Sequence, residues 1–143
     1  MTPVSAAQDK AARDVWLTMS ALVMDNQRRR EVTEAVGLSF GKTKALRRVA
    51  ARPMTMRELA VALLVDPPNL TGVVDDLEQA GLVERQDHPT DRRAKLVVAT
   101  DAGAAVARQA NEILAQPPDA LRKLSPADLA ALRRILALMA EDS

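Results

Sequence analysis

The hydrophobic period of this chain changes twice, and the change limits the folds that the chain can adopt. Between residues 5 and 81, apolar residues recur mainly at spacings of three and four, which is typical of helices that bury one face. The segments "LVERQD" (82–87) and "AKLVVAT" (94–100) surround a polar tip and are typical of two short strands. The helical period returns after residue 100. The sequence therefore predicts a mainly α fold with a small β-hairpin wing.

Capping residues divide the helical part of the chain into six predicted helices. Thr55 and Glu58 have the spacing of a capping box, and Gly81 can adopt the left-handed conformation that ends a helix. Asp66 and Pro67 offer an N-cap and a first-turn proline for the fourth helix. The predicted ranges are about 5–34, 39–51, 56–65, 67–80, 101–116 and 126–139.

Composition excludes several classes of protein. The 143 residues are 48% hydrophobic and 27% charged, which fits one globular domain with a core. The chain has no cysteine, so disulfides and thiolate metal sites are excluded. No apolar run approaches the roughly 18 residues of a membrane span, and the first residues lack a signal-peptide pattern. We therefore expect a cytoplasmic protein.

The net charge of +1 conceals two segments of opposite charge. Residues 38–52 contain five basic and no acidic side chains, whereas residues 66–81 contain four acidic and no basic side chains. A protein with almost no net charge can still present a basic face to an anionic partner. For the segment 38–52, a solvated helix face is an equally good interpretation.

The order of the predicted elements is that of a winged helix-turn-helix. In such a fold the fourth helix reads the major groove, and a hairpin carries cations to the adjacent backbone or minor groove. Arg92 and Arg93 at the hairpin tip suit that role. The alternative is that a small helical domain has this order by chance and that the two arginines lie in a solvated loop.

The sequence offers no catalytic or metal-binding constellation. His88 is the only histidine, and with Pro89 beside it we interpret it as a turn residue. One histidine without cysteine does not predict a metal site, and no glycine-rich phosphate loop is present. We expect neither an enzyme nor a cofactor.

The segment "LTGVVDDLEQAGLVERQDHPTDRRAKLVVATDAG" (70–103) resembles the signature region of the MarR family of bacterial transcriptional regulators. "VDPPN" before it resembles the start of the family's recognition helix, and "LSPADLAALRRILALM" resembles its last helix. One departure is Ala99 before Thr100, where the family usually has leucine. The resemblance implies a homodimeric repressor with a helical dimerisation region (1–37 and 101–143) and a winged DNA-binding region (38–100).

The resemblance also assigns roles in the wing. Arg93 aligns with the arginine of the family's Asp-x-Arg motif, which enters the minor groove, and Asp91 aligns with the acid that positions it. Arg92 is expected to meet a phosphate. Further cations predicted to neutralise phosphate are Arg57, Arg85 and Lys95.

On the fourth helix, the side opposite the apolar stripe contains Pro68, Asn69, Thr71 and Gly72. Asn69 can read adenine, Thr71 can contact a thymine methyl group or a phosphate, and Gly72 permits a close approach to DNA. We expect Asp75 to pair with an arginine of the wing or of a helix. For Asp76 and Glu78 we favour a solvated face.

The family resemblance further implies release from an inverted-repeat operator by a small aromatic or phenolic effector. Candidates to line its cleft are Trp16, Met19, Phe40, Leu46 and Arg47, although a stripe of this kind is more often core. The alternative function is a winged-helix module for protein interaction or dimerisation that does not read DNA. The acidic fourth helix favours this alternative, and Asp91-x-Arg93 argues against it.

Overall fold

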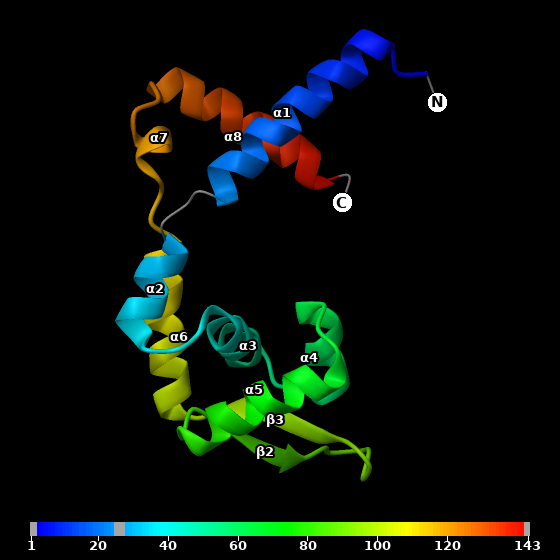
Figure 1. Cartoon of the computed structure of the whole chain (residues 1–143), viewed down its shortest axis with the longest axis vertical. Coiled ribbons are helices and arrows are strands. Elements are labelled where there is room, and N and C mark those ends of the chain that lie inside the picture. The colour runs from blue at the N-terminus through cyan, green and yellow to red at the C-terminus, as the bar shows by residue number, and fades with distance from the viewer. Residues whose placement is uncertain (1–2, 25–27, 142–143) are drawn as a thin grey trace.

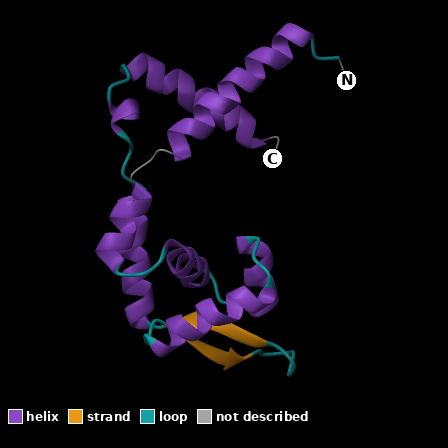
Figure 2. Ribbon diagram, viewed as in Figure 1, coloured by secondary structure: helices purple, strands orange, loops and turns teal. Residues whose placement is uncertain are grey.

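The computed structural model describes residues 3–24 and 28–141, and in this part of the chain it is mainly helical with a small antiparallel sheet (Figures 1 and 2). This confirms the predicted fold class. The helices are α1 (Ala6–Met24), α2 (Arg28–Val36), α3 (Phe40–Ala51), α4 (Met56–Leu63), α5 (Pro67–Gln79), α6 (Asp101–Leu114), α7 (Asp119–Arg122) and α8 (Pro126–Glu141). The strands are β1 (Met54–Thr55), β2 (Val83–Asp87) and β3 (Lys95–Ala99).

The core lies entirely between residues 32 and 110 of the described chain. We call residues 28–114, from α2 to α6, the winged module, and α1 with α8 the terminal helices. Apolar side chains from every element of the winged module are buried, whereas α1 and α8 contain no buried residue. The buried apolar residues are Val32, Ala45, Leu46, Val49, Met54, Leu59, Ala60, Leu70, Val74, Leu77, Val83, Val97, Ala107 and Ala110.

The prediction of one helix over residues 5–34 was wrong. Two helices, α1 and α2, occupy this range, and Figure 1 shows that they do not share an axis; residues 25–27 lie outside the described residues. The reason is that α2 buries Val32 and packs against α3 and α6, whereas α1 makes no such contact with the core. The short helix α7, which follows Pro117 and Pro118, was also not predicted.

The sheet has the strand order β1-β3-β2, and both pairings are antiparallel. The predicted hairpin is confirmed: Val83 pairs with Ala99, and Asp87 pairs with Lys95. Strand β1 was not predicted, because two residues are too short to show a period of two. It pairs with β3 through Met54 and Val97 and so attaches the start of α4 to the wing.

Helix ends follow the capping pattern of the sequence. The Thr55 hydroxyl accepts the Glu58 N–H at 3.1 Å, so the expected cap of α4 is present. Gly81 has a φ of 77°, as predicted for the residue that ends α5. The N–H of Leu82 then donates to the carbonyl of Leu77 at 3.0 Å, which turns the chain sharply into β2.

The turn after α5 meets the start of α6 at a close backbone contact. Thr100 donates its N–H to the carbonyl of Leu82 at 3.0 Å and its hydroxyl to the carbonyl of Gly81 at 2.7 Å. Its hydroxyl also accepts the N–H of Gly103 at 3.1 Å, which caps α6. A Cβ atom on Gly103 would lie 1.9 Å from the Leu82 carbonyl oxygen. Only glycine allows α6 to start this close to the turn.

We therefore expect Gly103→Ala to lower the free energy of unfolding by about 3 kcal/mol or more, because backbone must shift to relieve the contact. Gly41→Ala in α3 is the matched control, since nothing lies within 4 Å of its Cβ position. That change should stabilise the helix by about 1 kcal/mol. Urea denaturation of both variants measures the difference, and equal stabilities would contradict the packing described for α6.

Candidate nucleic-acid interface

Helix α5 turns one face to the core and leaves the other open. Leu70, Val74 and Leu77 are buried. The opposite side exposes the four residues that the sequence predicted for base contacts: Pro68, Asn69, Thr71 and Gly72. The structure therefore places these four on the accessible side of the helix.

The first turn of α5 has its own hydrogen bonds. Asp66 occupies the N-cap position but makes no hydrogen bond to a backbone N–H of the helix, so the predicted cap is absent. Pro67 and Pro68, the first two residues of the helix, have no N–H to donate. The Asp66 carboxylate instead accepts the side-chain amide of Asn69 at 2.7 Å, and the Thr71 hydroxyl donates to the carbonyl of Pro67 at 3.0 Å.

The acidic residues of α5 are held by basic residues of neighbouring elements. The guanidinium group of Arg85 in β2 bonds to Asp75 at 2.6 Å and to Glu78 at 2.9 Å. The backbone N–H of Arg85 also donates to Glu78, at 3.1 Å. In α3, Lys42 pairs with Asp76 at 3.0 Å.

These pairs decide the predictions for the three carboxylates. The predicted pairing of Asp75 with an arginine is confirmed. Asp76 and Glu78 are exposed, as the interpretation of a solvated face predicts, and each also pairs with a cation of an adjacent element. Sequence reasoning did not predict the ion pair of Lys42 with Asp76. The two segments of opposite charge were visible in the sequence, but their pairing depends on the packing of α3 against α5.

The wing tip, residues 88–94, is ordered by local hydrogen bonds. The Nδ1 atom of His88 accepts the N–H groups of Thr90 at 3.2 Å and Asp91 at 3.1 Å. The Asp91 carboxylate accepts the N–H of Arg93 at 2.9 Å, so it fixes the backbone of Arg93 and not its guanidinium group. Within residues 3–24 and 28–141, the guanidinium groups of Arg92 and Arg93 form no hydrogen bond or ion pair.

Lys95 forms an ion pair across the hairpin. Its ammonium group donates to the Asp87 carboxylate and lowers the pKa of Asp87 below its ordinary value. A carboxylate with a lowered pKa stabilises the fold above its unfolded pKa, and this contribution is lost as the pH falls through the folded pKa. At neutral pH the charge of Lys95 is therefore already partly compensated within the wing.

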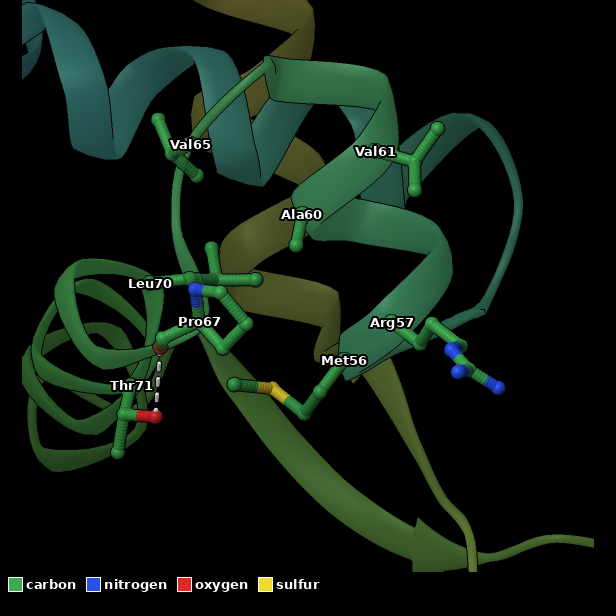
Figure 3. A pocket seen from close by; sticks show the side chains of 8 residues that line it. All are labelled: Met56, Arg57, Ala60, Val61, Val65, Pro67, Leu70 and Thr71. Carbon is green, nitrogen blue, oxygen red and sulfur yellow. Dashed lines mark hydrogen bonds between the residues drawn. The ribbon is translucent and has the colours of Figure 1, made fainter.

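Two hollows lie beside this surface. The first, of about 510 Å³, separates α4 from the start of α5, and Met56 projects into it while Arg57 points outward (Figure 3). The second, of about 460 Å³, lies between the start of α4 and the wing, and we call it the wing hollow. Its lining residues are Thr55, Met56, Arg57, Arg85, Asp91, Arg93, Ala94 and Lys95.

The wing hollow brings together half of the residues predicted for DNA binding, from α4, β2, β3 and the wing tip. It contains four cations and one acid. Arg85 and Lys95 already have acidic partners, whereas the side chains of Arg57 and Arg93 have no partner in the described part of the chain. The unpaired positive charge of the hollow therefore resides on Arg57 and Arg93.

The residues predicted for an effector cleft are not brought together in this way. Leu46 is fully buried in the core. Trp16 lines a small hollow of about 330 Å³ on α1 with Ala12, Arg13 and Leu17. Phe40 and Arg47 are on α3, where the Arg29 guanidinium group lies 4.4 Å from the Phe40 ring and Arg47 bonds to Asn111 at 2.6 Å. Met19 is half-buried on α1.

Among the described residues, no group of His, Asp and Glu side chains is arranged to hold a metal ion. The same residues include no helix that is both long and apolar enough to cross a membrane.

The fold and this surface define the protein as a winged helix-turn-helix protein. A MarR family profile matches residues 36–94. A protein of Thauera aromatica, described as a transcriptional regulatory protein for the hcr operon, is 34% identical over 109 residues, which are 75% of this chain and 66% of that protein. The chain belongs to the MarR family of transcriptional regulators.

Two solved structures illustrate the similarity. RV1404 from Mycobacterium tuberculosis matches with a TM-score of 0.75 and 25% identity over 98% of this chain and 95% of its own. Sco3205 from Streptomyces coelicolor, a MarR family regulator in complex with DNA, matches with a TM-score of 0.63 and 23% identity over 99% of this chain and 91% of its own. The chain spans between 40% and 66% of the length of the first curated relatives that it matches.

The Arg85 contacts predict a measurable contribution to stability. Arg85→Met should lower the free energy of unfolding by about 1 kcal/mol, because charge-assisted hydrogen bonds to two carboxylates are lost at a side chain that is only 24% exposed. Arg92→Met, which removes the same charge without an ion pair, is the control and should change stability by no more than about 0.5 kcal/mol. If thermal melts of the two variants agree, Arg85 does not attach the wing to α5.

Proposed function

We propose that the protein binds double-stranded DNA as a homodimer, recognises an inverted repeat and represses transcription. In this proposal α5 enters the major groove and the wing tip contacts the adjacent minor groove. A dimer bound across a promoter excludes RNA polymerase, which is why we favour repression. The DNA complex of the similar protein Sco3205 supports DNA as the partner.

The observation that carries the proposal is the pair of unpartnered arginines in the wing hollow. Arg57 and Arg93 come from α4 and the wing tip and line one depression. Neither has a partner in the described chain, so neither contributes an ion pair to the fold. Two cations without internal partners beside an exposed helix suit the backbone of a nucleic acid.

The internal ion pairs remove the main objection to DNA binding. Three carboxylates on α5 would repel phosphates if they were free. Their partners, Arg85 and Lys42, compensate this charge before DNA arrives. We propose that Arg85 and Lys95 act mainly within the protein, and that Arg57, Arg92 and Arg93 supply most of the charge for phosphate.

Gly72 supports close contact between α5 and DNA. It lies in the interior of the helix, and nothing lies within 4 Å of the position that a Cβ atom would take. A helix-interior glycine costs about 1 kcal/mol relative to alanine, and the packing of the fold gives no reason for that cost. Close approach of DNA to the helix at Gly72 would explain why a glycine is present there. Asn69 and Thr71 beside it would exchange their present intrachain bonds for base or phosphate contacts.

The terminal helices supply the proposed dimer interface. Trp16 is 64% exposed, Met24 is 81% exposed and Leu138 is 54% exposed, which is unusual for large apolar side chains in a stable monomer. We propose that 1–37 and 101–143 form the dimerisation region and 38–100 the DNA-binding region. Packing of α2 and α6 against α3 joins the two regions within one chain.

A small aromatic or phenolic effector remains part of the proposal. Trp16 and Met19 on α1 with Phe40 and Arg47 on α3 are its candidate contacts. Leu46 cannot take part in the present conformation, because no part of its side chain is exposed.

We expect Arg93→Ala to weaken operator binding by about 1–3 kcal/mol per contact and to flatten the dependence of affinity on salt, because fewer counterions are released. Arg92→Ala should have a smaller effect if Arg92 meets only phosphate. The measurement is a salt-titrated binding isotherm on an inverted repeat selected from random duplexes.

Thermal melts provide the control, since both side chains are exposed and neither supports the core. Unchanged affinity in Arg93→Ala would reject the wing assignment. A wild-type protein that selects no DNA sequence would favour the alternative, a winged-helix module for protein contacts.

We expect wild-type protein to sediment as a dimer at micromolar concentration and Leu136→Glu to sediment as a monomer. Leu136 is 41% exposed on α8, so a charge there should disrupt the interface without disturbing the core of the winged module. Arg134→Glu on the opposite side of α8 is the control and should remain dimeric. A dimer that survives Leu136→Glu would show that α8 is not its interface.

A further inference from the structure

Two passages of the chain connect the winged module to the terminal helices. One lies between α1 and α2, and the other runs from the end of α6 through residues 115–118 to α7. Figure 1 shows α2 and α6 side by side, and the two helices pack against each other. The direction of the terminal helices relative to the winged module is therefore set where α2 begins and α6 ends.

The second passage has few hydrogen-bond donors of its own. Pro117 and Pro118 have no N–H, and a proline also disfavours the helical conformation in the residue before it. The carbonyl groups of Gln116 and Pro117 therefore follow α6 without the backbone partners that a continuing helix would supply.

Arginine side chains supply the missing donors. Arg28, the first residue of α2, donates from Nε to the Gln116 carbonyl at 3.3 Å and from a terminal nitrogen to the Pro117 carbonyl at 3.2 Å. Glu31 holds the same guanidinium group at 2.8 Å. From the other side, Arg122 of α7 donates to the Pro117 carbonyl at 3.3 Å and to the Gln116 side chain at 3.1 Å.

Arg28 therefore ties the start of α2 to the exit from α6, across 88 residues of sequence. Its side chain is only 20% exposed, and a planar guanidinium group with several donors fixes orientation better than a single ammonium group would. The start of α2 and the second passage are thus joined by this one side chain.

We infer that Arg28 is a positioning residue that fixes the orientation of the winged module relative to the terminal helices. In a symmetric dimer this orientation sets the separation of the two α5 helices, and hence the spacing of half-sites that the dimer accepts. Half-sites lie about 34 Å apart, and one base pair adds about 3.4 Å. A small rotation at the passages is therefore enough to change the preferred spacing. The role of Arg28 in half-site spacing rests on the proposed function, but its role in orientation does not.

The first experiment measures orientation without DNA. The chain has no cysteine, so Glu84→Cys in β2 and Arg134→Cys in α8 introduce the only two sites for spin labels. Labelled chains are diluted into excess unlabelled protein, so that each distance lies within one chain. We expect a narrow distance distribution in this background, a broad one after Arg28→Gln, and an intermediate one after Arg122→Gln.

Arg30→Gln is the matched control. It removes the same charge from α2, two residues away, and the Arg30 side chain makes no hydrogen bond or ion pair within the described residues. Its distance distribution should equal that of the parent. A distribution that stays narrow in Arg28→Gln would overturn the inference.

The second experiment measures binding to inverted repeats whose half-sites are moved apart or together by single base pairs. We expect Arg28→Gln to bind the best spacing about three- to tenfold more weakly, because only part of a broader ensemble is competent to bind. Its preference over the neighbouring spacings should be nearly lost, while Arg30→Gln keeps the parent profile. An unchanged, sharp spacing profile in Arg28→Gln would refute the role in spacing. If the parent binds no inverted repeat, the proposed function fails, and the distance measurement still decides the role of Arg28.

Discussion

The contact between Gly103 and the Leu82 carbonyl is the constraint on which the arrangement of the winged module depends. At this point the turn that ends α5 and starts β2 meets the turn that ends β3 and starts α6. Thr100 donates its N–H to the Leu82 carbonyl and its hydroxyl to the Gly81 carbonyl, and this hydroxyl also caps α6. Helix α5, the β2–β3 hairpin and helix α6 are therefore fixed to each other by a few backbone atoms.

The charged residues of the winged module fall into two groups, those with an ion-pair partner inside the described chain and those without one. One group is satisfied internally: Arg85 and Lys42 compensate the acids of α5, and Lys95 pairs with Asp87. The other group, which includes Arg57 and Arg93, has no internal partner in the described chain. The exposed pair of Lys95 with Asp87 contributes little to stability. Arg85 and Lys42 compensate negative charge on the helix face beside the second group. The near-zero net charge of the chain results from this pairing and does not argue against an anionic partner.

Sequence reasoning recovered the features that local chemistry determines. The cap at Thr55, the helix end at Gly81 and the β2–β3 hairpin each depend on a few neighbouring residues. Features that depend on distant contacts were missed. The division of the first predicted helix follows from packing of Val32 on α3 and α6, and the pairing of Asp76 follows from the approach of α3. The missing cap at Asp66 was decided locally, because its carboxylate accepts the side-chain amide of Asn69, and Pro67 and Pro68 have no N–H.

The distribution of the core explains why the terminal helices and the winged module can serve different purposes. All buried apolar residues of the described chain lie between residues 32 and 110, so the winged module has a core of its own. The terminal helices contribute no buried residue to that core, and most of their large apolar side chains are exposed. Burying those side chains therefore requires a surface outside the winged module, and a second copy of the chain presents the same stripe in symmetric form. Among the described residues, Arg28 joins the winged module to the segment that leads to α7 and α8. An interaction that is weak in energy, such as a few hydrogen bonds from Arg28, can decide geometry there because no core residue does so.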